Sequence, residues 1–84
     1  MSIFATSRVW DIPLPPMQRL VLLFLADISG PDDVCWPSIS VLAERLCVTH
    51  VTVLAALSKL ESAGLVKRQR RPGRATNLYT LTLS

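Results

Sequence analysis

The chain has 84 residues, half of them apolar, and a net charge of +3 at neutral pH. This length predicts one domain with a single core, and the longest apolar run, residues 20–26, is far shorter than the ~20 residues that span a bilayer. No basic segment precedes a cleavage site, so we expect a cytoplasmic protein without an export signal or a membrane span.

The first segment, residues 1–16, is expected to be an irregular N-terminal arm. Pro13, Pro15 and Pro16 are incompatible with the interior of a helix. Trp10 and Ile12 are expected to pack back onto the rest of the domain.

A helix is predicted to begin near Pro16, a residue suited to a first helical turn. Its core face is expected to follow the i, i+3, i+4, i+7 spacing of Met17, Leu20, Val21, Phe24 and Ile28. Leu22 and Leu25 fall outside this face and are still apolar. Either the arm or another chain must cover them. Turn-forming residues 29–33 then end the helix.

Two shorter helices and a small strand are predicted next. Residues 34–36 are expected to form a strand that pairs beside a later hairpin. Ser38 and Thr49 are suitable N-caps for the two helices, which are joined by a turn at Cys47 and Val48. The inward positions repeat the helical spacing, and they are Ile39, Leu42, Ala43, Leu46, Val53, Ala56, Leu57 and Leu60. Gly64 stands where a left-handed residue ends a helix.

The last segment, residues 65–84, alternates as a β-hairpin around a Pro-Gly turn. One face is expected to hold Val66, Tyr79, Leu81 and Leu83, and the other Lys67, Gln69, Thr80 and Thr82. Residues 1–42 carry a net charge of −2 and residues 43–84 a net charge of +5, with five cations within residues 67–74. These cations form either a solvated edge that resists aggregation or a surface that contacts phosphates.

A helix–turn–helix followed by a basic hairpin is the plan of a winged-helix domain that meets a DNA duplex with a helix and a charged loop. The predicted fold class is therefore α+β and mainly α, with three helices and a small antiparallel hairpin as the wing. We expect a single domain, 1–84, in which 17–64 is the three-helix core and 65–84 the wing.

The segment LAERLCVTHVTVLAALSKLESAGLVKR resembles the helix–turn–helix of winged-helix regulators of the GntR type. The longer stretch 16–66 is similar to winged-helix domains of phage and plasmid replication proteins, through its apolar first helix, acidic loop and Trp36-Pro37-Ser38 step. The resemblance implies bacterial or phage origin, double-stranded DNA as the partner and often a homodimer. The implied function is a transcriptional regulator or the DNA-binding part of a replication initiator.

By that resemblance the third predicted helix is the recognition helix, and its positions that match DNA-facing sites are Thr49, His50, Val51, Thr52, Leu54 and Ala55. Phosphate contacts are expected from the wing residues Lys67, Arg68, Arg70, Arg71 and Arg74. The chain departs from the family in lacking charged groups on this helix face and in having Cys47 where a glycine is usual.

A second hypothesis follows from the same departure. The apolar residues Val51 and Leu54, extended by Leu22 or Leu25, could form an interface with a second copy or with another protein. In that case the wing alone would meet DNA, if DNA is bound at all.

We expect neither an enzyme nor a metal or cofactor site, nor a small-molecule substrate. His50 is the single histidine, and no nucleophile–base pair, metal-spaced cluster or phosphate-binding glycine loop is present. Asp32 and Asp33 belong to a turn, and Cys35 and Cys47 are expected to be small buried thiols.

Overall fold

The computed structural model describes residues 3–74 and 76–82. Within them it contains four helices and a three-stranded antiparallel sheet of order β1-β3-β2. The elements in chain order are α1 (Ile3–Asp11), α2 (Pro16–Ile28), β1 (Val34–Cys35), α3 (Ile39–Leu46), α4 (His50–Ser62), β2 (Val66–Gln69) and β3 (Leu78–Leu81). The predicted class, mainly helical with a small sheet, is confirmed.

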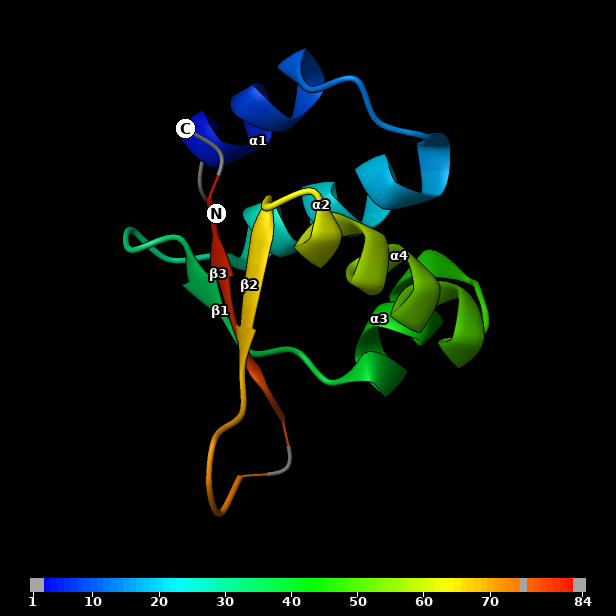
Figure 1. Ribbon diagram of the computed structural model, residues 1–84, viewed down its shortest axis with the longest axis vertical. Coiled ribbons are helices and arrows are strands. Elements are labelled where there is room, and N and C mark those ends of the chain that lie inside the picture. The colour runs from blue at the N-terminus through cyan, green and yellow to red at the C-terminus, as the bar shows by residue number, and fades with distance from the viewer. Residues whose placement is uncertain (1–2, 75, 83–84) are drawn as a thin grey trace.

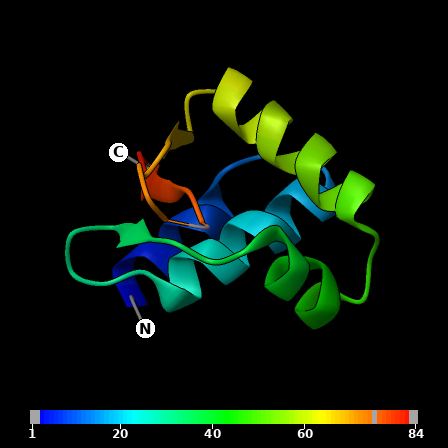
Figure 2. The same cartoon turned by 90° about the horizontal axis from the view of Figure 1, so that it is seen from below.

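The helices surround α2, and the hairpin projects from them (Figure 1). α1 packs across α2 at one end of the long axis, and the loop between β2 and β3 extends at the opposite end. Viewed from below, α2 runs through the middle, with the sheet to one side and α3 to the other (Figure 2). The wing is the hairpin formed by β2, β3 and the loop between them.

The N-terminal arm contains a helix, α1, so the prediction of an irregular arm is wrong. The prolines follow this helix and end it rather than preventing it. An isolated helix of nine residues is marginal in water, and α2 supplies the missing stabilisation. Arg19 of α2 donates from Nη1 to the carbonyl oxygen of Val9 at 2.9 Å and from Nη2 to that of Ile12 at 2.8 Å. A cation at this end also matches the helix dipole.

Ile12 packs against the core as predicted, whereas Trp10 meets the rest of the domain only at its surface. The side chain of Trp10 is 62% exposed, and the Arg19 guanidinium lies over its ring, 5.5 Å from the centroid. Val9 is the residue of this part of α1 that is fully buried.

The buried face of α2 differs from the predicted one. Leu22 and Leu25 are completely buried, whereas Leu20 and Ile28 are 45% and 41% exposed. α2 contacts α1, α3 and α4, so its buried surface is set by three neighbours and not by one amphipathic stripe. Leu22 and Leu25 were candidates for an interface with another chain. That prediction is wrong because both residues are buried in the core of this chain.

The helix–turn–helix follows the prediction closely. Ser38 Oγ accepts from the Val41 backbone N–H at 3.0 Å, and Thr49 Oγ1 accepts from that of Thr52 at 3.2 Å, so both predicted N-caps are present. The axes of α3 and α4 turn by 107°, as in a helix–turn–helix. All the predicted inward positions of α4 are buried, and they are Val53, Ala56, Leu57 and Leu60.

Cys47 ends α3 in the left-handed region at φ 57°, the conformation for which a glycine is usual. Its backbone N–H caps α3. Its side chain is exposed, so the prediction of a buried thiol holds for Cys35 and is wrong for Cys47. The reason is its place in the turn, outside both helices.

The sheet confirms the third strand and the two-faced hairpin. β1 pairs with β3, and Val66 lies opposite Leu81 across β2 and β3. Val66, Tyr79 and Leu81 are buried; Leu83, assigned to the same face, lies outside the described residues. Gly64 has the expected left-handed backbone at φ 76°. Its carbonyl accepts a hydrogen bond from the Thr82 hydroxyl, which ties the end of α4 to the hairpin.

Candidate nucleic-acid interface

The N-terminal turn of α4 is exposed, and its polar groups are partly occupied. Thr49 Oγ1 and Thr52 Oγ1 are 2.9 Å apart, and Thr49 also caps the helix. His50, the first residue of α4, is exposed. Four of the predicted DNA contacts lie in this turn, namely Thr49, His50, Val51 and Thr52. The two threonines are engaged with each other, so His50 and Val51 have the side chains that are both exposed and unengaged.

Apolar groups dominate the outward face of α4. Val51 is 75% exposed and Leu54 is 45% exposed, and Ala55 beside them is also exposed. These three residues are the α4 stripe. They lie one helical turn apart or less, so they form one continuous patch on the surface.

The wing reverses direction at a Pro-Gly turn. The Arg74 backbone N–H donates to the carbonyl of Arg71 at 3.0 Å, and Gly73 has φ 75°. A positive φ at the third position of the turn requires glycine or a similarly tolerant residue, and proline suits the second position. Arg71 and Arg74 are therefore the first and last residues of the turn.

Arg68 is held by an ion pair and is not a simple phosphate contact. Its Nε lies 2.7 Å from Oε1 of Glu61, which belongs to the last turn of α4. Arg68 lies opposite Tyr79 in the sheet register, and directly opposed residues project from the same face. Strand alternation therefore turns Arg68 toward the helices, whereas Lys67, opposite Thr80, projects from the other face.

Arg71, the first residue of the Pro-Gly turn, is also engaged. Its guanidinium lies over the Trp36 ring, 5.4 Å from the centroid, and its Nη1 donates to Thr76 Oγ1 at 3.3 Å. A cation over an indole face is attracted by the ring quadrupole. These contacts make Arg71 a brace between the wing and the segment after β1.

The three remaining cations of the predicted set, Lys67, Arg70 and Arg74, are exposed. Among the described residues the structure shows one ion pair, that of Arg68 with Glu61. A polar hollow of about 520 Å³ is lined by Arg68, Arg70, Arg74 and Asn77. Guanidinium groups gathered around a hollow are suited to bind a phosphate.

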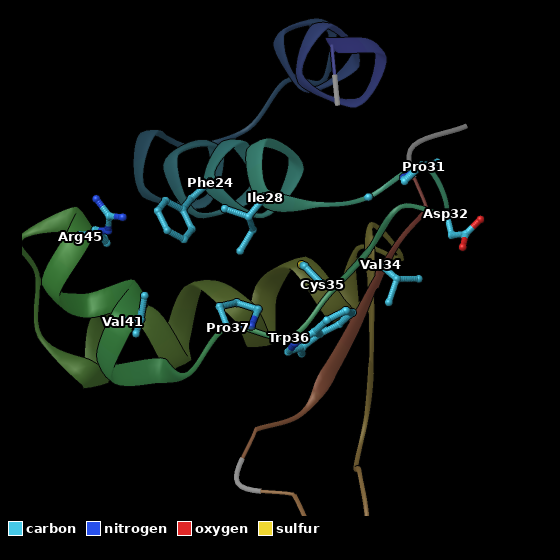
Figure 3. A pocket seen from close by; sticks show the side chains of 11 residues that line it. Phe24, Ile28, Pro31, Asp32, Val34, Cys35, Trp36, Pro37, Val41 and Arg45 are labelled. Carbon is cyan, nitrogen blue, oxygen red and sulfur yellow. The ribbon is translucent and has the colours of Figure 1, made fainter. Parts of the chain in front are cut away.

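A second concavity lies on another face. It is an apolar groove of about 750 Å³ between α2, β1 and α3. Figure 3 shows Phe24 and Ile28 of α2 pointing toward the chain that carries Cys35 and Pro37. Trp36 lines this groove and also contacts Arg71, so the groove borders the wing.

The described residues hold no group of three potential metal ligands. Burial raises the pKa of the Cys35 thiol, which disfavours the nucleophilic thiolate, and a hydrogen bond with Ser29 opposes this only partly. Burial likewise raises the pKa of Tyr79. Among the described helices none is by itself long and apolar enough to cross a membrane; α3 and α4 match such a span only as a sharply bent pair.

The partners of two wing cations were not predicted from the sequence. Of the five cations expected to contact phosphate, Arg68 is bound by Glu61 and Arg71 lies over Trp36. The alternation of β2 carried a signal for the first, because Arg68 is two residues from the buried Val66. No local pattern indicated the second, since Trp36 and Arg71 are brought together by the pairing of β1 with β3.

Comparison with known proteins agrees with this geometry. The chain is 36% identical over 78 residues to Protein YmfN of Escherichia coli (strain K12), and the aligned part covers 87% of this chain and 17% of that protein. Residues 13–66 match the family described as "Helix-turn-helix domain", a segment that runs from before α2 to the first residue of β2. This match covers more than half of the chain and includes both α3 and α4, and the chain therefore belongs to this helix-turn-helix domain family.

Proposed function

We propose that the chain is a winged helix-turn-helix module that binds double-stranded DNA, with α4 in the major groove and the wing on the phosphate backbone. One observation carries the proposal: an exposed face of α4 occurs together with a wing that has free cations. These cations are Lys67, Arg70 and Arg74, which are exposed and form no ion pair with a carboxylate among the described residues. An α-helix fits the major groove, and clustered cations release counterions from the duplex.

The biological role that we propose is control of transcription or DNA binding within a replication initiator. The support is the resemblance of the helix–turn–helix to regulators and replication proteins. The chain spans 17% of the length of its relative YmfN, and a module of this size would act by delivering another activity or subunit to DNA.

The salt dependence of binding tests the proposal. If Lys67, Arg70 and Arg74 each neutralise one phosphate, log K against log salt should have a slope of about −2.7, at about −0.9 for each phosphate. The measurement is fluorescence anisotropy of a labelled random-sequence duplex between about 50 and 200 mM salt. Replacing Arg70 and Arg74 together by alanine should reduce the slope to about −0.9 and weaken binding to all duplexes alike.

Arg8→Ala is the control for the loss of positive charge. Arg8 is exposed on α1, at the end of the molecule remote from the wing (Figure 1), so this variant should keep the wild-type slope. No binding at low salt, or an Arg70/Arg74 variant with an unchanged slope, would contradict the proposal.

A second candidate function is protein interaction through the α4 stripe. The observation that favours it is the exposure of Val51 and Leu54, because an apolar group in water brings no benefit to a monomer. On this hypothesis Leu54→Lys should dissociate a homodimer or release a partner in sedimentation experiments while the fold stays intact. A wild-type chain that sediments as a monomer at high concentration would exclude the homodimer.

A further inference from the structure

The outward face of α4 has almost no capacity to read bases by hydrogen bonds. Arg or Lys makes bidentate hydrogen bonds to guanine, and Asn or Gln makes them to adenine. Glu or Asp accepts a hydrogen bond from the amino group of cytosine. None of these residue types occurs among residues 50–57, the N-terminal eight residues of α4. Thr49 and Thr52 are already paired with each other, which leaves His50 as the one unengaged polar side chain in the first turn.

What this face offers instead is a pair of large apolar side chains, Val51 and Leu54. In the major groove, thymine is the one standard base that presents an apolar group, its C5 methyl. Val51 and Leu54 are three residues apart, which is about 4.5 Å along the helix axis. This separation is close to the step of about 3.4 Å between neighbouring bases of one strand.

The surroundings of the stripe favour DNA as its occupant. No carboxylate occurs in residues 49–58, so nothing in the exposed half of α4 repels a phosphate backbone. Lys59 on the same helix is exposed, and β2 leads directly from α4 to the exposed wing cations. A stable protein interface needs roughly 20–30 residues a side, and the stripe has three.

We infer that Val51 and Leu54 are specificity-determining residues that read thymine methyl groups, so that the preferred target is a duplex with adjacent thymines in one strand. The inference rests on the DNA binding proposed above and adds the base that α4 selects. The wing supplies affinity for any sequence, and the stripe supplies the discrimination.

The test is removal of single methyl groups from the DNA. A preferred duplex is first selected from a random pool with the 84-residue chain, and each thymine is then replaced by deoxyuridine, which keeps the base pair and lacks the methyl. Each contacted methyl should be worth about fourfold in Kd. Putting 5-methylcytosine in place of cytosine in a duplex that lacks thymine at those positions should recover part of the affinity.

Leu54→Ala connects the effect to the residue. In this variant, replacement of one particular thymine by deoxyuridine should no longer weaken binding, because the side chain that contacts its methyl group is gone. A double-mutant cycle between Leu54 and that methyl group measures their coupling. Leu20→Ala is the matched control, since Leu20 on α2 has the same 45% exposure and lies outside the stripe; it should bind as the wild type does. Circular dichroism of each variant checks that the fold is kept.

The outcomes separate the inference from the proposed function. A wild-type chain that binds duplex with the expected salt slope and shows equal affinity for thymine and deoxyuridine sites would overturn the inference alone. A preferred sequence, selected from the random pool, that contains no adjacent thymines would do the same. A wild-type dimer that Leu54→Ala splits would assign the stripe to a protein interface and also overturn it. Failure to bind any duplex would remove both the inference and the proposed function.

Discussion

We expect the ion pair between Arg68 and Glu61 to stabilise the fold and to weaken the DNA binding proposed above, so its removal should shift these two properties in opposite directions. The pair joins β2 to α4 with Nε and Oε1 2.7 Å apart, and the two side chains are 38% and 29% exposed. Replacing Glu61 by alanine removes the carboxylate, leaves Arg68 without its partner and keeps a residue that favours a helix.

The expected loss of stability is modest because the pair is partly in water. An exposed pair contributes about 0.2–1 kcal/mol, and we expect the free energy of unfolding to fall by about this amount. For a domain of this size that corresponds to a decrease in Tm of roughly 1–8 °C, at about 4–8 °C per kcal/mol. Thermal unfolding followed by circular dichroism measures it.

DNA binding should change in the other direction. The released Arg68 joins Lys67, Arg70 and Arg74 around the wing, so the number of neutralised phosphates rises from three to about four. The slope of log K against log salt should steepen from about −2.7 to about −3.6, and affinity at low salt should increase.

Glu44→Ala is the matched control, because Glu44 is an exposed glutamate on α3 outside this ion pair. It removes the same charge and should leave the salt slope as it is. If Glu61→Ala weakens DNA binding, or leaves both the slope and Tm unchanged, then the ion pair does not restrain Arg68 and the reasoning is refuted.

Three further predictions concern stability. Leu57 is completely buried, so Leu57→Ala should lower the free energy of unfolding, measured by urea denaturation, by about 2–5 kcal/mol. The same change at the exposed Leu54 should lower it by less than about 1 kcal/mol. Equal losses would show that the inner face of α4 is misassigned. Cys47→Gly should raise the free energy of unfolding by about 0.5–1 kcal/mol in reducing buffer, because φ is 57° there, and a decrease would contradict this. Tyr79 is the single tyrosine, and burial raises its pKa above the usual value of 10.0. The folded state therefore holds the phenol proton more tightly than the unfolded state does. Its contribution to stability should be full below pH ~10 and be lost as pH rises through the folded pKa. A spectrophotometric titration with a midpoint at or below that of free tyrosine would disprove it.

The sequence by itself determined the helix–turn–helix and the outline of the hairpin. Ser38 and Thr49 act as N-caps through hydrogen bonds within three residues, and the buried positions of α4 follow a helical period that a sequence displays directly. The alternating burial along β3 and the Pro-Gly turn are local in the same sense. Such signals can be read without knowing the neighbours of each element.

Tertiary structure decided the features that depend on contacts between distant segments. α1 is a helix because α2 covers one face of it and Arg19 caps its carbonyls, ten and seven residues away along the chain. The buried face of α2 could not be read from one period because three helices contact it, and for this reason Leu22 and Leu25 are core residues and not an interface.

The candidate DNA-binding site also combines features that the sequence predicts with features that only the fold decides. The exposure of Val51 and Leu54 followed from the period of α4, and the wing cations were visible as a cluster of charge. Which of those cations are available for phosphate was set by Glu61 and Trp36, which reach Arg68 and Arg71 only once the sheet has paired. A charge in the sequence has no partner until the fold brings one within a few ångströms, since electrostatic attraction between exposed groups is strongly attenuated by water beyond that range.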